Sequence, residues 1–200
     1  MPDKSHIIAE ATKMMINQGV RSVRMGDIAT DLSVSKRTLY EMFGDKENLI
    51  AECLMCHFYQ MEQKYKGIMD QAKNIIEKTI VMLQDIDQTI ETNLKLMDGV
   101  RKFYPKTYEE IFRHRDESKH VEEFRQHIQH GIKEGLFLPH INADLATTVL
   151  SDSLYGLVLN MEKFKERNIA PSQAFKYVIT YFFRGIATEK GIRMMDEYIT

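Results

Sequence analysis

Four neighbouring residues with hydrogen-bond donors carry the most distinctive chemistry of this sequence. They are Ser35, Lys36, Arg37 and Thr38. Their hydroxyl, ammonium and guanidinium groups suit phosphate oxygens and the edges of bases. Ser35 is also a favourable N-cap, so a helix is predicted to begin there and to present the next three residues on its first turn. The pattern indicates contact with a nucleic acid.

Two short helices joined by a tight turn are predicted over residues 25–43. Ile28, Ala29 and Leu32 lie three and four positions apart, so they form one apolar face of the first helix. The segment 33–35 is too short for a free loop and suits a fixed turn. Together these features predict a helix-turn-helix, whose second helix enters the major groove of DNA. An ordinary helical hairpin with a solvated end would give the same pattern.

The second helix of this motif carries signals at both ends. With Ser35 as N-cap, Val34 and Leu39 occupy the positions of a hydrophobic staple. Gly44 is a stop signal, and Asp45 suits the cap of the next helix. The residues expected to face inward are Leu39, Met42 and Phe43, which leaves Lys36, Arg37, Thr38 and Tyr40 facing outward.

Charge alone does not predict a nucleic-acid binder. The 200 residues carry a net charge of −2, and residues 1–47 contain as many acidic as basic side chains. A DNA-binding surface must therefore depend on where the charges lie. Arg24, Lys36, Arg37 and Lys46 cluster around the predicted turn. No secretory signal and no apolar run of membrane-spanning length is visible, so we expect a cytoplasmic protein without a membrane partner.

Helical periodicity continues along the chain, and no segment alternates with period two, so an all-α fold of about nine helices and no sheet is expected. The length suits one or two small domains. The expected helices cover about 3–18, 25–43 as a pair, 46–70, 72–97, a stretch that ends at 134, 142–166 and 171–188.

The last two expected helices are apolar over a wide arc, and such a helix needs partners on two sides. Gly156 and Gly185 would let other helices approach closely. The pattern favours a homodimer joined by a four-helix bundle, with a helix buried inside a monomer as the alternative. The predicted interface residues are Leu150, Leu154, Leu157, Met161, Phe175, Val178, Phe182 and Ile186.

Residues 53–57, Cys-Leu-Met-Cys-His, match the pattern for covalent haem attachment. Haem attachment is not expected, because the chain lacks an export signal and the five residues lie inside a continuous amphipathic helix. A cytoplasmic thiol redox sensor that uses Cys53 and Cys56 stays an alternative, although a disulfide between residues one turn apart would strain the helix. Two reduced cysteines on a packed helix are the simplest interpretation.

The sequence contains no recognisable motif for a metal site or an enzyme. His127 and His130 are one helical turn apart, but no carboxylate or cysteine completes a ligand set at motif spacing. The sequence has no zinc-protease motif, nucleophile elbow, glycine-rich phosphate loop or dinucleotide fingerprint. We therefore expect no metal, no cofactor, no catalytic residue and no enzyme.

Residues 19–50 resemble the DNA-binding domain of the tetracycline-repressor (TetR/AcrR) family. The positions that carry the resemblance are Ile28-Ala29, Val34-Ser35-Lys36, Thr38-Leu39-Tyr40, Phe43 and Lys46-Glu47-Asn48-Leu49. Two positions depart from the family pattern. Val23 and Arg24 stand where the family usually has Ser or Thr, and Ser33 stands where it usually has the turn glycine. Arg24 could replace the lost hydroxyl contact with a charged one.

The resemblance implies an N-terminal three-helix DNA-binding domain over 1–47 and a helical effector-binding and dimerisation domain over 48–200. It implies a homodimeric regulator that binds a palindromic operator in double-stranded DNA. A repressor is expected, with an activator as the alternative. Lys36 and Arg37 would then contact bases or phosphates, and Thr38 could contact a base edge. The phosphate candidates are Tyr40, Ser35, Lys46 and Arg24.

The resemblance also implies release from DNA by a small-molecule effector, which would favour a dimer whose recognition helices are wrongly spaced. The effector is expected in a pocket within the helical domain. The candidate lining residues are Met61, Tyr65, Phe103, Tyr104, Phe112, His127 and Tyr155. A helical interaction protein that does not bind DNA is a further alternative.

Overall fold

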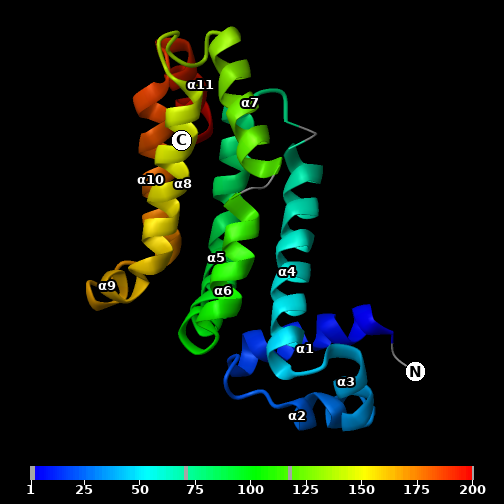
Figure 1. The fold of residues 1–200 in the computed structure, drawn as a ribbon. Coiled ribbons are helices and arrows are strands. Elements are labelled where there is room, and N and C mark those ends of the chain that lie inside the picture. The colour runs from blue at the N-terminus through cyan, green and yellow to red at the C-terminus, as the bar shows by residue number, and fades with distance from the viewer. Residues whose placement is uncertain (1–2, 70–71, 117–118, 200) are drawn as a thin grey trace. The chain divides into compact units, whose positions relative to one another are not determined.

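The computed structural model describes residues 3–69, 72–116 and 119–199, and every regular element in these ranges is a helix (Figure 1). Within them, a single isolated bridge joins Phe137 to Ala187. The predicted all-α fold is confirmed. The helices are α1 (Lys4–Gln18), α2 (Met25–Asp31), α3 (Lys36–Phe43), α4 (Lys46–Met69), α5 (Ile75–Phe103), α6 (Pro105–Asp116), α7 (Lys119–Lys133), α8 (Ala143–Leu159), α9 (Met161–Glu166), α10 (Pro171–Ile186) and α11 (Glu189–Ile199).

The chain forms two compact units, and both α4 and α5 contribute to each of them. Unit 1 comprises Met1–Lys64 and Thr92–Arg115, and unit 2 comprises Tyr65–Glu91 and Asp116–Thr200. The units therefore group residues by packing, whereas the boundary predicted after residue 47 follows the chain. That domain boundary stays a prediction.

In unit 1, α1, α2 and α3 enclose a small apolar core with the first half of α4. Asp3 caps α1, because its carboxylate accepts a hydrogen bond from the His6 backbone N–H at 2.8 Å. Ile7, Ile28 and Leu39 are fully buried, one from each of the three short helices. Gly99 of α5 lies against Val20, where an added Cβ would come within 3.0 Å of a side-chain carbon. This packing fixes the α1–α3 segment within unit 1.

In unit 2, α8 packs against α7 and α10, and the aromatic core lies among these helices. The rings of Phe137 and Phe183 stack with centroids 5.7 Å apart, and both residues are almost completely buried. Backbone hydrogen bonds tie the segment after α7 to the end of α10, since the Leu138 N–H donates to the Ile186 carbonyl at 2.9 Å. Unit 2 therefore has a core of its own.

The helix boundaries differ from the prediction at α5, which continues to Phe103 instead of ending near residue 97. Two further differences concern the later helices. A single helix was expected over 142–166, but Asn160 leaves helical geometry and separates α8 from α9. Its side-chain amide donates to the Gly156 carbonyl at 2.8 Å, a local bond that competes with the helical ladder. The second difference is α11, which the sequence patterns did not predict. Tertiary contacts hold it, with Met195 buried and Gly191 against the Leu136 carbonyl.

Candidate nucleic-acid interface

The turn between α2 and α3 has a fixed geometry. Ile28 and Ala29 are buried, so α2 is held by its apolar face as predicted. The Val34 N–H donates to the Ala29 carbonyl at 2.9 Å, which closes the chain back onto α2. Ser33 has a φ of +53°, the left-handed conformation that favours glycine. This finding explains why the resembling family has a glycine at this turn, and it shows that Ser33 adopts the same conformation.

The predicted cap of α3 is confirmed. Ser35 is the N-cap, and its Oγ accepts a hydrogen bond from the Thr38 backbone N–H at 3.0 Å. Leu39 and Phe43 are buried and anchor the helix from within, while Gly44 ends it with a φ of +78°. Because the buried residues fix the rotation of α3, its opposite side must face solvent.

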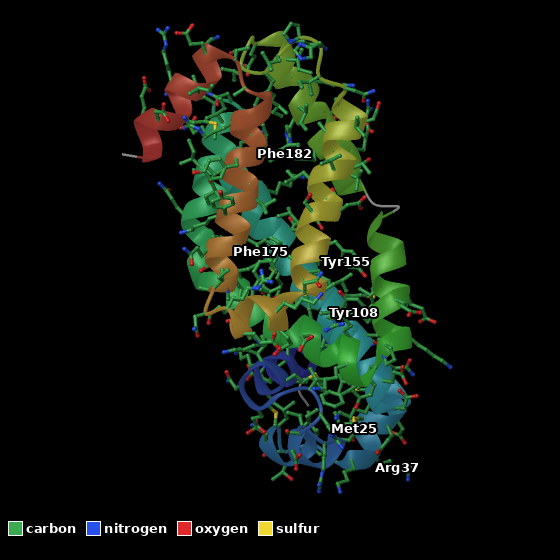
Figure 2. The ribbon with its side chains drawn as sticks, turned by 90° about the vertical axis from the view of Figure 1, so that its left-hand side faces the viewer. Met25, Arg37, Tyr108, Tyr155, Phe175 and Phe182 are labelled. Atoms are coloured by element: carbon green, nitrogen blue, oxygen red, sulfur yellow. The ribbon has the colours of Figure 1, made fainter. Side chains whose placement is uncertain are left out.

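The solvent-facing side of α3 carries the predicted contact residues. Ser35, Lys36, Arg37 and Tyr40 are exposed, and Thr38 is half-buried beside the cap. Figure 2 shows Arg37 on the outer surface of unit 1. The structure thus brings these five side chains onto one short helix, as a surface rich in hydrogen-bond donors. Whether each contacts a base or a phosphate stays a prediction.

The sequence patterns did not predict that Gly26 of α2 contributes to this surface. The Lys36 side chain crosses Gly26 of α2, where an added Cβ would come within 2.7 Å of the Lys36 Cε. A side chain at position 26 would therefore push the end of Lys36 aside. The sequence signal for Gly26 is a glycine inside a predicted helix, which often marks a place where another group packs closely against the backbone.

Arg24 lies at the N-cap position of α2, with its side chain exposed. Its backbone N–H donates to the Asp27 carboxylate at 2.8 Å, so Asp27 closes the first turn of α2. The Arg24 guanidinium is then available at the start of the motif, where a phosphate contact was predicted.

Lys46 has a different environment from the other candidates. Its ammonium donates to the carbonyls of Val20 and Arg21 at 2.9 and 3.3 Å. It also lies 5.7 Å from the centre of the Tyr104 ring. The neighbouring Glu47 accepts a hydrogen bond from the Thr107 hydroxyl at 2.5 Å. These contacts join α4 to the loop after α1 and to the start of α6, so the structure gives Lys46 an internal role in unit 1.

The described candidate pocket residues are divided between the two units. Met61, Phe103 and Tyr104 belong to unit 1, whereas His127 and Tyr155 belong to unit 2. The Phe103 ring lies 5.1 Å from the Arg21 guanidinium. The side chains of Tyr65 and Phe112 lie outside the described part of the structure.

His127 is the candidate pocket residue with a perturbed ionisation. Burial lowers the pKa of His127, and the nearby Lys78 ammonium lowers it further. The two side chains join α7 to α5, with Lys78 Nζ 3.1 Å from His127 Nε2. Since the lowered pKa favours the neutral ring, His127 accepts the hydrogen bond and Lys78 donates it. The pocket itself stays a prediction.

The cysteine pattern has a packing role. Cys53 is buried, and its thiol donates to the Ile8 carbonyl at 3.6 Å. Burial raises the pKa of Cys53 to about 12. His57 Nε2 lies 2.6 Å from the amide oxygen of the buried Asn93 on α5. Among the described residues, no group of three or more His, Cys, Asp and Glu side chains is arranged to hold a metal ion.

Residues of a dimer interface should be exposed in the single chain, but several of the predicted interface residues are not. Leu150, Met161, Phe175 and Ile186 are buried within the chain itself, and Phe175 is labelled in Figure 2. Leu154, Leu157, Val178 and Phe182 are partly exposed. The exposed apolar side chains on α8 and α10 are others: Leu145, Val149, Tyr155, Leu159, Tyr177 and Tyr181.

Comparison with known proteins identifies the motif. Residues 7–53 match the family described as bacterial regulatory proteins of the tetR family. The N-terminal segment that holds the helix-turn-helix therefore belongs to this family, as the resemblance implied. The matched family is described as regulatory, which agrees with the expectation that this chain is not an enzyme. No helix in the described part of the chain is both long and apolar enough to cross a membrane.

Three similar proteins share between 17% and 30% of their residues with this chain over the matched parts. An uncharacterized HTH-type transcriptional regulator, YvaF of Bacillus subtilis, is 30% identical over 100 residues, which is 49% of this chain and 52% of that one. This chain therefore matches about half the length of YvaF. The HTH-type transcriptional repressor KstR2 of Mycolicibacterium smegmatis is 20% identical over 76% of each chain. A transcriptional regulator from Saccharomonospora viridis, solved in complex with choline, has the same fold. It has a TM-score of 0.73 and 17% identity, over 92% of this chain and 96% of that one.

Proposed function

We propose that this chain is a transcriptional repressor that binds a palindromic operator as a homodimer and leaves it when a small molecule binds. The observation that carries the proposal is α3, whose buried residues hold an exposed first turn of hydrogen-bond donors outward. In a helix-turn-helix this turn contacts base edges. The name of the related KstR2 supports repression. Since access to chromosomal DNA is required, the proposal extends to a cytoplasmic location.

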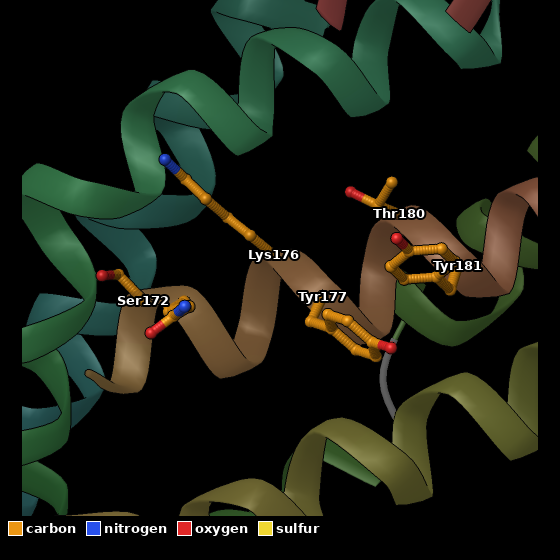
Figure 3. Close-up of a pocket in the computed structure, with 6 residues that line it drawn as sticks. Ser172, Lys176, Tyr177, Thr180 and Tyr181 are labelled. Carbon is orange, nitrogen blue, oxygen red and sulfur yellow. The ribbon is translucent and has the colours of Figure 1, made fainter. Parts of the chain in front are cut away.

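Dimerisation is supported by an exposed apolar face on α8 and α10. Tyr177 and Tyr181 are 64% and 57% exposed, and their ring centroids lie 4.4 Å apart on one side of α10 (Figure 3). This face lies along an open groove lined by Ser172, Gln173, Lys176, Tyr177, Thr180 and Tyr181. At Gly156 and Gly185 no atom beyond the local backbone of the same helix lies within 4 Å of an added Cβ, so a second helix could approach there. A second copy would bury this face and pair two recognition helices on successive major grooves.

Release by a small molecule rests on the family and on one neighbour, the regulator solved with choline. The effector of this chain would bind in the helical domain, and Met61, His127 and Tyr155 remain candidates for its contacts. In this proposal the effector weakens operator binding. Coupling between two binding sites is reciprocal, so operator DNA must also weaken effector binding. Operator DNA should therefore weaken effector binding by the same factor that effector weakens operator binding.

The test is selection of bound sequences from a random duplex pool at a stated salt concentration. The protein is unfolded and refolded first, which removes any bound small molecule. An enriched palindrome with half-sites about one helical turn apart is expected. Absence of any enriched sequence would reject the proposal and leave a helical interaction protein.

Arg24→Ala refines the test, since a phosphate contact carries no sequence information. The variant should lose affinity equally for all sequences, and its salt slope should fall by about one. Arg167→Ala is the matched control, because Arg167 is an exposed arginine of unit 2, outside the helix-turn-helix. A change in sequence preference for Arg24→Ala would contradict its assignment to phosphate.

A further inference from the structure

We propose that Glu41 positions Arg37 for the recognition of a guanine, so that Glu41 sets sequence preference without itself touching DNA. The inference rests on the proposed function, in which α3 reads an operator. The observation is an ion pair on the exposed side of α3. Arg37 Nε donates to the Glu41 carboxylate at 2.7 Å, one helical turn away.

The pair is not explained by stability of the helix. The two side chains are 87% and 61% exposed, and exposed ion pairs of this kind contribute little to stability. The order along the helix is also the less favourable one, since the cation precedes the anion. The macrodipole favours acidic residues in the first turn and basic residues in the last turn.

The charge arrangement of α3 opposes its own dipole. Its first turn has no acidic residue and its last turn has no basic one. Lys36 and Arg37 instead occupy the first turn, and Glu41 lies near the C-terminal end. By contrast, α4 has Glu47 in its first turn and Lys66 in its last. The charges of α3 therefore follow a requirement other than helix stability.

The geometry of the pair suits recognition of a base. Arginine has five N–H donors in a fixed planar fork. Glu41 binds the Nε side of this fork, which leaves both terminal nitrogens of Arg37 available. Two terminal N–H groups match the O6 and N7 acceptors of guanine in the major groove. Holding the long side chain in one orientation before binding reduces the ordering cost of that contact.

A carboxylate on a DNA-facing helix also has an opposite effect on affinity. Glu41 repels phosphates, so it weakens binding to every sequence. Glu41 should therefore lower the affinity for all DNA sequences and raise the preference for the sequence that Arg37 recognises. The two effects can be separated, because the repulsion is uniform and the positioning acts only where Arg37 meets a base.

The experiment compares base preference in the wild-type protein and in the variants Glu41→Gln, Arg37→Ala and the double variant. Each is measured on the selected operator and on operators with one base pair changed. Arg37→Ala should reduce the preference for one G·C pair by about tenfold. Glu41→Gln should reduce the same preference by about threefold, a part of that loss, and should bind unrelated DNA more tightly. In the double variant, Glu41→Gln should have no further effect on that preference, which is the coupling expected of a pair that acts together.

The matched control is Glu10→Gln, which makes the same charge change in another exposed ion pair of unit 1. Glu10 lies on α1, with its carboxylate 2.6 Å from the Lys13 ammonium. It should leave base preference unchanged. Helix content and unfolding midpoints confirm that each variant folds.

Two results would overturn the inference while leaving the proposed function intact. One is a palindrome whose base preferences Arg37→Ala does not alter. The other is a Glu41→Gln variant that binds all sequences more tightly with an unchanged profile, in which case Glu41 is only a repelling surface charge. A wild-type protein that enriches no sequence would reject the proposed function and the inference together.

Discussion

Ser33 is the residue of the helix-turn-helix that has a positive φ although it is not a glycine. It holds a φ of +53° without the freedom of glycine. For an L-residue with a side chain, this conformation costs about 1–2 kcal/mol, part of which glycine loses again in the unfolded chain. The structure keeps Ser33 there because α2 and α3 are both anchored by buried side chains.

Replacing Ser33 by glycine is expected to stabilise the protein. The free energy of unfolding should rise by about 0.5–1 kcal/mol, as measured by urea denaturation followed by circular dichroism. The control is Ser22→Gly in the loop after α1, where the serine does not have a positive φ. That change should be neutral or destabilising. Equal effects of the two substitutions would contradict the strain assigned to Ser33.

The two cysteines should differ sharply in reactivity. The thiolate is the reactive form, and burial raises the pKa of Cys53 to about 12. Cys56 is only partly buried. A thiol reagent at pH 8 should therefore modify Cys56 in the folded protein and Cys53 only when the protein unfolds. Cys56→Ser should remove the fast reaction. Rapid labelling of Cys53 in the folded chain would revive the redox alternative.

At the scale of elements, α11 depends on close contact with the segment after α7. An added Cβ at Gly191 would lie 2.3 Å from the Leu136 carbonyl oxygen and 3.2 Å from the Ala187 side chain. The first neighbour is backbone, which cannot move aside cheaply. The Thr188 N–H also donates to the Leu136 carbonyl at 2.9 Å, so displacing the segment would disturb a hydrogen bond.

Gly191→Ala should therefore destabilise the protein by about 1–3 kcal/mol, the usual cost of overpacking. Gly67→Ala is the control, because nothing lies within 4 Å of an added Cβ at that position of α4. It should gain about 0.5–1 kcal/mol from the better helix former. Thermal and urea unfolding measure both. If Gly191→Ala were as stable as Gly67→Ala, α11 would not be packed as described.

At the scale of the whole molecule, the property to test is the proposed pairing of two copies. A single helix-turn-helix has a small contact area with DNA. When two of them are linked in a dimer, binding of the first raises the effective concentration of the second at its half-site, which increases affinity. The exposed apolar face of α8 and α10 is the surface that we assign to this pairing. Because the predicted residues Leu150 and Phe175 are buried within the chain, substitutions there would damage folding instead of testing the dimer.

Tyr181→Glu tests the dimer with less risk to the fold, since Tyr181 is 57% exposed. The variant should sediment as a monomer, and its operator affinity should fall by about a hundredfold or more. Tyr59→Glu is the control, because Tyr59 of α4 is 61% exposed and lies in unit 1. It should remain a dimer. A Tyr181→Glu variant that is still dimeric would move the interface elsewhere.

Sequence alone determined the features that depend on neighbours in the chain. Capping by Ser35, the end of α3 at Gly44 and the apolar face of α2 each involve residues within one helical turn, so local pattern was sufficient to predict them. The motif match over residues 7–53 has the same local origin.

Tertiary structure decided which side chains remain available. The bonds from Lys46 to the carbonyls of Val20 and Arg21 span about 25 residues of sequence and no periodicity signals them. The same holds for the contact between Gly191 and Leu136, which holds α11. Hydrophobic spacing locates the apolar side of a helix but does not distinguish burial inside one chain from burial between two, because both remove the same surface from water. For that reason the pattern predicted a pairing face on α8 and α10 but named several residues that the fold had already buried.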